Sequence, residues 1–214
     1  MIYQRKLMKI TTSTTIVAMS LAIAGCATST TNYAPPTEAK VINTKFVNKP
    51  FDAVWDGLVK ELSSDFFVIN NIDKNSRLIN ISFTSQRPSE FVDCGTTSRT
   101  LKNARGDQSY SYKTADGANF TTTNDQGSAF NVRRTSRLEG RTNIYVAPES
   151  TGTNITVNTK YLVSVAMLVT AIDGRPAGSE NFIFDPSTKQ TFSNGSITCA
   201  AVGAIEERIL RAAQ

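Results

Sequence analysis

The 214-residue chain contains no histidine, only three cysteines and a single tryptophan. Without histidine it cannot form a Ser-His-Asp triad, a Cys-His nucleophile pair or a metal site built on imidazole. A Ser-Lys pair remains possible, but no SxxK motif occurs, and no phosphate-binding loop of the Walker or Rossmann type is present. The sequence therefore predicts a protein that is not an enzyme and that holds neither a metal nor a cofactor.

The N-terminal segment has the organisation of a secretory signal. Basic residues at Arg5, Lys6 and Lys9 precede an apolar run over 16–24, which is shorter than the roughly 20 residues of a membrane-spanning helix. The run ends in small residues followed by Cys26. An ordinary signal with a chance cysteine is one interpretation of this pattern.

The segment Ile23–Cys26 resembles the lipobox of bacterial lipoproteins, and this resemblance is the interpretation that we favour. It implies cleavage of the signal peptide 1–25 and attachment of acyl chains, such as palmitate, to Cys26. In that class an aspartate after the cysteine marks inner-membrane retention, so Ala27 implies anchoring to the outer membrane, facing the periplasm. Cleavage would leave 20 Lys and Arg against 18 Asp and Glu, so the basic pI gives no argument for nucleic acid.

Two cysteines, Cys94 and Cys199, would remain after cleavage. An even number in an oxidising compartment favours a disulfide between them, and two separate buried thiols are the alternative. Closing a loop of this length would stabilise the fold by roughly 4–5 kcal/mol on the chain-entropy model.

Residues 26–38 are polar and contain a proline pair, which predicts the lipidated cysteine followed by a flexible tether. Residues 39–214 are expected to form a single α+β domain. Apolar residues recur at helical spacing from Phe51 to Leu62, with Trp55 as the packing anchor. Alternating patterns over 79–83 and 155–167 predict strands, the second long and central. Without a βαβ rhythm, the expected architecture is an antiparallel β-sheet with two helices packed on one face.

The second helix is expected near the C-terminus, capped by Ser196 or Thr198. In this helix Glu206 and Glu207 are expected to face solvent rather than to form an acid-base pair. The apolar stripe of the helix would be Val202, Ile205 and Ile209.

The segment 96–128 is rich in Thr, Ser, Asn, Asp and Gly, and we expect a polar insertion that cannot form a core element. An Asp116-Gly117 pair between alternating residues predicts a hairpin within it. Aromatic side chains of this hairpin, together with basic side chains beside it, could bind a partner protein. The partner-binding candidates are Arg99, Lys102, Arg105, Tyr110, Tyr112 and Phe120.

Residues 96–141 together carry eight basic and four acidic residues, a net charge of +4. This excess describes either a solvated loop and strand face or a surface for an anionic partner, such as lipid head groups or another envelope protein. The sequence leaves both interpretations open.

Several motifs resemble a known lipoprotein family. The helix over 51–58 (FDAVWDGL), the extended 67–69 and the turn and strand over 73–79 look like the helix-grip repeat of the C subunit of the β-barrel assembly machinery (BamC). The cysteine segments 91–95 and 199–206 look like those of uncharacterised lipoproteins of that fold. The resemblance covers about half of the mature chain and implies a helix-grip, BamC-like fold.

Taken together, these features predict an outer-membrane lipoprotein that acts as a non-enzymatic structural or assembly component of a secretion or barrel-assembly machinery. Its partners would be the membrane, through Cys26, and other cell-envelope proteins. The alternative is a periplasmic carrier of a small ligand or lipid, because helix-grip sheets can enclose an apolar cavity under the helix.

Overall fold

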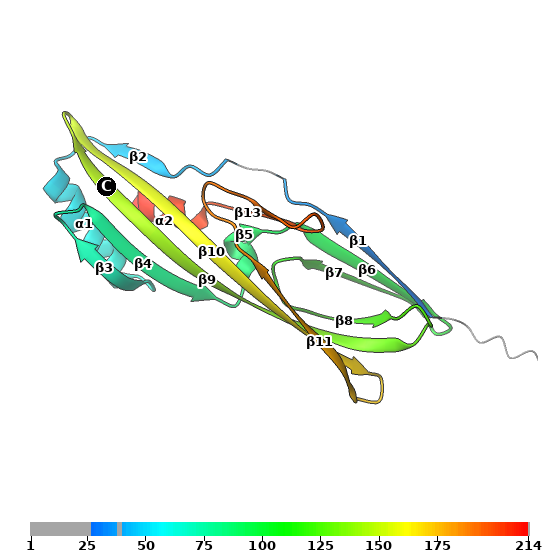
Figure 1. Cartoon of the computed structure of the whole chain (residues 1–214). Coiled ribbons are helices and arrows are strands. Elements are labelled where there is room, and N and C mark those ends of the chain that lie inside the picture. The colour runs from blue at the N-terminus through cyan, green and yellow to red at the C-terminus, as the bar shows by residue number, and fades with distance from the viewer. Residues whose placement is uncertain (1–26, 38–39, 214) are drawn as a thin grey trace, which may run out of the picture.

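One long hairpin organises the computed structural model, which describes residues 27–37 and 40–213 (Figure 1). Its strands β9 (Ala129–Glu149) and β10 (Gly152–Ala171) are paired continuously, from Glu149↔Gly152 to Phe130↔Ala171. Twenty residues at about 3.3 Å per residue give the hairpin a length of roughly 65 Å. The prediction of a long central strand over 155–167 is confirmed, and the strand extends further in both directions.

Five shorter strands complete a seven-stranded antiparallel sheet around the hairpin. Near the β9–β10 turn, β4 pairs with β9 and with β3, and β2 pairs with β10. Near the open end of the hairpin, β8 pairs with β9 and β11 with β10. These strands are β2 (Thr44–Val47), β3 (Val68–Asp73), β4 (Leu78–Ser85), β8 (Ala118–Thr123) and β11 (Pro176–Phe184).

Two small sheets lie outside this arrangement, in the orders β1-β6-β7 and β12-β13-β5. Their strands are β1 (Thr28–Ala34), β5 (Val92–Asp93), β6 (Thr96–Asn103), β7 (Gly106–Lys113), β12 (Phe192–Ser193) and β13 (Thr198–Ala201). The remaining elements are the helices α1 (Phe51–Ser64) and α2 (Ala204–Ala212) and the short 3-10 helix η1 (Pro88–Glu90). The structure is thus mostly antiparallel sheet with two helices, which confirms the α+β class.

Both helices pack on one face of the main sheet, at the end that holds the β9–β10 turn (Figure 1). The helix expected from Phe51 is confirmed, and its apolar positions, including Trp55, are buried against the sheet. Even-numbered residues of β9 and odd-numbered residues of β10 face this core. Position 140 lies on this face and requires glycine, because the ring of Phe83 occupies the space that a Cβ would need. We call the opposite, uncovered face of the sheet the outer face.

The expected flexible tether over 26–38 is not what the structure shows, because residues 28–34 form β1. All seven residues of β1 are paired with β6. The Tyr33 hydroxyl also bonds the backbone of Thr198, and the Ser29 hydroxyl contacts Thr122. Composition alone missed this order because its stabilisation comes from pairing with a strand more than 60 residues away.

The expectation that 96–128 cannot form a core element is also wrong. The segment supplies β6, β7 and β8, and it buries the side chains of Leu101 and Phe120. The hairpin expected around Asp116-Gly117 does not form, because β7 pairs with β6 whereas β8 pairs with β9. This turn therefore carries the chain from one sheet to another.

A disulfide joins Cys94 to Cys199, as expected from the sequence. It lies beside the pairing of β5 with β13, and both sulfurs are buried in the main core. The last helix begins later than expected, since Thr198–Ala201 is a strand and Gly203, in the left-handed conformation, precedes the helix. Cys199 is consequently not at a helix start, and Val202 is exposed rather than part of an apolar stripe.

Removing the disulfide should destabilise the fold strongly, because it closes a loop of 105 residues that would otherwise be unrestricted in the unfolded chain. For the double variant Cys94→Ala/Cys199→Ala we expect the free energy of unfolding to fall by about 4 kcal/mol, measured by urea titration. The reduced wild type is the matched control and should behave similarly. An equal unfolding midpoint for oxidised and reduced protein would contradict this expectation.

Candidate functional site

Four of the six residues predicted to bind a partner gather in the half of the molecule that lacks the helices. Arg99 on β6, Tyr110 and Tyr112 on β7, and Phe120 on β8 lie between the β1-β6-β7 sheet and the main sheet. A fifth residue, Arg134 on β9, completes this group, which we call the arginine–aromatic stack.

Stacked rings and guanidinium groups form the centre of this group. The rings of Tyr112 and Phe120 are nearly parallel, with centroids 5.8 Å apart and planes inclined by 8°. The Arg99 guanidinium lies 4.2 Å from the centroid of Phe120, and Arg134 lies 5.7 Å from that of Tyr112. Cation–π contacts of this kind gain strength where water is excluded.

The polar bonds of Arg99 go to uncharged groups. Its Nε donates to the Tyr112 hydroxyl at 3.1 Å, and its Nη1 donates to Thr31 Oγ1 on β1 at 2.9 Å. Arg99 therefore links three strands while its charge is not matched by a carboxylate within ion-pair distance among the described residues.

Arg134 is only 6% exposed, and it donates to the backbone carbonyls of Thr114 and Asp116. Burial is the main cause that lowers the pKa of its guanidinium below the usual value, and nearby Arg99 adds to this effect, while Tyr112 and Asp116 oppose it. The alternation of inward and outward positions along β9 predicts the burial of this residue, because Arg134 lies an even number of residues before the inward Leu138 and Ile144.

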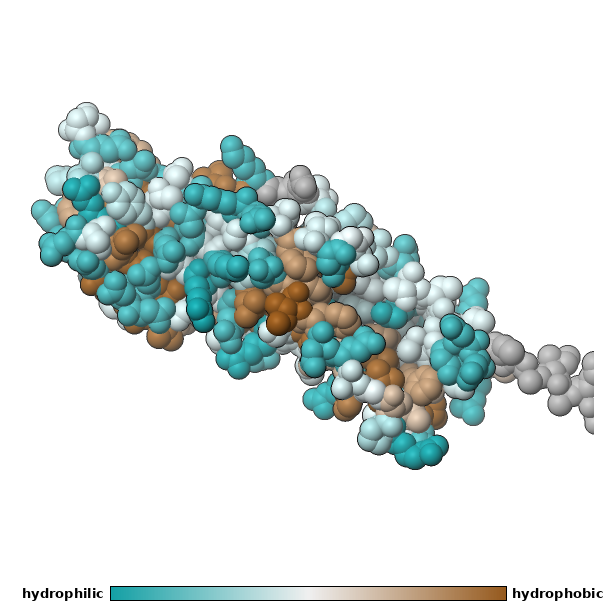
Figure 2. Space-filling model, in the orientation of Figure 1, coloured by the Kyte–Doolittle hydropathy of each residue, from teal (hydrophilic) through white to brown (hydrophobic). Residues whose placement is uncertain are grey.

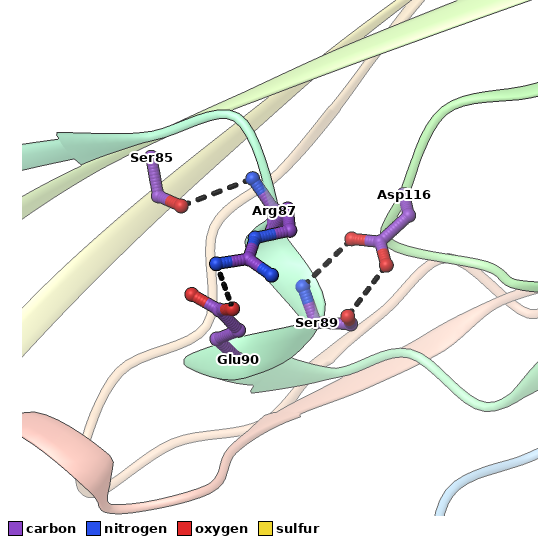
Figure 3. Close-up of polar contacts among 5 residues, drawn as sticks. All are labelled: Ser85, Arg87, Ser89, Glu90 and Asp116. Carbon is purple, nitrogen blue, oxygen red and sulfur yellow. Dashed lines mark hydrogen bonds and ion pairs between the residues drawn. The ribbon is translucent and has the colours of Figure 1, made fainter.

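The carboxylate of Asp116 faces the 3-10 helix η1 (Figure 3). It accepts hydrogen bonds from the backbone N–H of Ser89, at 2.8 Å, and from the Ser89 hydroxyl. Arg87 and Glu90 form a separate ion pair at the same helix. Asp116 thus joins two elements. Its carboxylate bonds Ser89 of η1, and its backbone carbonyl oxygen accepts a hydrogen bond from Arg134.

Lys102 and Arg105 do not join the stack. Lys102 lies near the end of β6 and forms an exposed ion pair with Asp107. Arg105 is exposed in the turn between β6 and β7. Phe120, in turn, is buried and therefore not available to a partner in this conformation. The partner-binding role assigned to these six residues stays a prediction, and the structure divides them into a stack and a loop tip.

A mixed basic and apolar surface covers the outer face, and its arginines belong to the basic stretch 96–141 for which the sequence left open a surface for an anionic partner. Arg133, Arg137 and Arg141 point outward from β9, and their side chains make no hydrogen bond or ion pair to another described residue. Exposed apolar side chains lie beside them on β10 and β11, and Figure 2 shows apolar surface where these strands cross the view. The apolar members are Leu162, Leu168 and Ile183.

Glu206 corrects the expectation for the last helix, since its side chain is fully buried whereas Glu207 is exposed. The Glu206 carboxylate accepts hydrogen bonds from the Tyr161 hydroxyl, at 3.0 Å, and from Thr188 Oγ1, at 2.6 Å. The sequence held a signal for this burial, because Leu210 lies four residues after Glu206 on the same face of the helix. A buried carboxylate held by two hydroxyls fixes the helix against β10.

Among the described residues no group of acidic and cysteine side chains could hold a metal ion. Within the same part of the chain, no helix is long and apolar enough to cross a membrane. Comparison with protein-family models, curated proteins and solved structures finds no match to this chain. Its function must therefore be inferred from the chemistry of these surfaces.

The Tyr161 hydroxyl should make stability depend on alkaline pH. Burial and the neighbouring Glu206 carboxylate raise the pKa of Tyr161 far above its ordinary value of 10.0. Above that pH the unfolded chain loses this proton and the native state keeps it, so stability falls by up to about 1.4 kcal/mol per pH unit from this group. In Tyr161→Phe this part of the slope should disappear.

The measurement is urea unfolding of the two proteins between neutral pH and pH values above 10.0. At neutral pH, Tyr161→Phe should lose about 1–3 kcal/mol because Glu206 keeps only one hydroxyl partner. Tyr145→Phe, at an exposed tyrosine, is the control and should keep the wild-type slope. Equal slopes for wild type and Tyr161→Phe would show that Tyr161 ionises as freely in the native state as in the unfolded chain.

Proposed function

We propose that this chain is an outer-membrane lipoprotein, anchored at Cys26, that acts as a non-enzymatic assembly component of a cell-envelope complex. The observation that carries the proposal is the outer face, where unpaired arginines lie beside exposed Leu162, Leu168 and Ile183. Arginine and large apolar side chains are characteristic of protein-binding surfaces, and an apolar patch on an exposed sheet marks a contact site.

The position of β1 supports an oriented anchor. Cys26 lies outside the described residues, and only Ala27 separates it from β1, which begins at Thr28. Contacts of Ser29 with Thr122 and Thr123 place this start beside the strand that pairs with the beginning of β9. The β9–β10 turn and the helices lie at the other end of the molecule (Figure 1). An anchor at Cys26 would thus let the helical end reach at most roughly 65 Å from the membrane, the length of the hairpin.

A helix-grip fold like that of the BamC family is part of the same proposal. The chain order β2, α1, β3 and β4 gives a strand, a helix and a hairpin, as in the family's repeat. The terminal helix α2 packs beside α1, and Arg208 of α2 forms an ion pair with Asp65 at the end of α1. These features favour a relationship of fold, and a secretion or barrel-assembly machinery is the corresponding class of partner.

The anchor can be tested with Cys26→Ser. We expect the wild-type chain to incorporate a palmitate analogue and to fractionate with the outer membrane, whereas Cys26→Ser should remain unlabelled because the acyl acceptor is missing. Ala27→Ser is the matched control, since it introduces a serine next to Cys26, leaves the acyl acceptor and the disulfide in place, and should still incorporate label. Labelling of Cys26→Ser would refute the lipoprotein assignment.

The partner surface can be tested by photo-cross-linking in whole cells. A photoreactive residue at Leu168, on the outer face, should capture the same envelope protein repeatedly, whereas one at Lys60, exposed on α1, should not. Arg137→Glu should reduce capture at Leu168 by about tenfold, because it reverses a charge in the contact. Lys60→Glu is the control for an equal change of net charge. Capture from Lys60 alone would move the contact to the helical face.

A further inference from the structure

A cavity of about 330 Å³ lies between the β1-β6-β7 sheet and the main sheet, next to the arginine–aromatic stack. Arg99, Tyr112 and Arg134 line one part of it. Its size lies within the range of small-molecule sites, which are mostly apolar with a few convergent polar groups.

The polar part of the cavity carries positive charge that the protein does not neutralise by an ion pair. Arg99 bonds two hydroxyls, and Arg134 bonds two backbone carbonyls. A guanidinium group has five N–H donors, so each of the two retains donors beyond those used in these bonds. Only 6% of Arg134 is exposed. Burying a charge costs free energy, and an opposite charge that pairs with it offsets that cost.

The remaining part of the cavity is apolar and comes from the edge of the main sheet. Met167 on β10 and Phe182 and Phe184 on β11 line it. Phe182 is 39% exposed although it is a large aromatic side chain, and its neighbour Glu180 is exposed on the same face of β11. The cavity therefore opens to solvent along β11, with Glu180 at its mouth.

From this arrangement we propose that the cavity binds a small amphipathic anion, with a carboxylate or phosphate group on Arg99 and Arg134 and an apolar body on Met167, Phe182 and Phe184. Arginine is suited to both anions because its planar group donates two parallel hydrogen bonds. The site is distinct from the outer face, since β9 presents Arg134 inward and Arg133 and Arg137 outward. It would add ligand binding to a protein whose proposed function is contact with other proteins.

The direct test is calorimetric titration of the purified protein with octanoate, octyl phosphate and the neutral 1-octanol. We expect saturable binding of one or both anions, and binding of 1-octanol at least about tenfold weaker, because only the anions pair with the arginines. The two anions distinguish a carboxylate source from a phosphate source. Equal affinity for the neutral and charged compounds would overturn the proposal, and so would the absence of binding.

Matched pairs of variants locate the binding. Arg99→Gln should weaken octanoate or octyl phosphate about tenfold, whereas Arg137→Gln, which removes the same charge from the outer face, should have no effect. Phe182→Ser should weaken binding by a similar factor, whereas Ile183→Ser, on the opposite face of the same strand, should not. If both members of either pair weaken binding equally, the anion binds by general surface charge or apolarity, and the proposal fails.

Because Arg99 also supports the stack, loss of binding in Arg99→Gln could follow from a damaged fold. Glu180→Gln avoids this difficulty, since it removes a negative charge from the cavity mouth without touching the stack. It should tighten anion binding by about threefold and leave 1-octanol unchanged, an increase that structural damage would not produce. Unchanged or weaker anion binding in Glu180→Gln would contradict the proposal that the anion binds in the cavity next to Glu180.

Discussion

The continuous pairing of β9 with β10 is the constraint on which the rest of the molecule depends. Side chains of a strand alternate between its two faces, so a single register fixes which residues of both strands face inward along the whole length. Every other strand of the main sheet attaches directly or through one neighbour to this hairpin. A shift of β9 by one residue would expose Ile144 and turn Arg133 and Arg137 inward, which makes the register strongly specified.

The two ends of the hairpin solve the problem of filling the space over the sheet in different ways. At the helical end, aliphatic and aromatic side chains of α1, α2 and the sheet form one contiguous core. At the other end, few large aliphatic residues are available, and the arginine–aromatic stack occupies the space instead. Hydroxyl and carbonyl acceptors make two inward arginines tolerable there. The same arrangement leaves a cavity with unmatched positive charge.

Three long-range links then join segments that are distant in the sequence. The disulfide ties β13 to the end of β5, and the Tyr33 hydroxyl ties β1 to β13. The carboxylate of Glu206 ties α2 to β10 and to the loop that contains Thr188. Together these links hold segments that are distant in the sequence in one defined arrangement.

The sequence by itself determined those features that local pattern controls. Helical spacing gave α1, alternation gave the core of β10, and the pair of cysteines gave the disulfide. The tertiary structure alone decided the partners of the polar strands: β1 and β6 are ordered by each other, and β7 and β8 belong to different sheets despite the Asp116-Gly117 turn. Local spacing places Arg134 and Glu206 on the inward faces of β9 and α2. Only the tertiary structure makes their burial tolerable, because the hydrogen-bond acceptors and donors that compensate their loss of water come from distant elements.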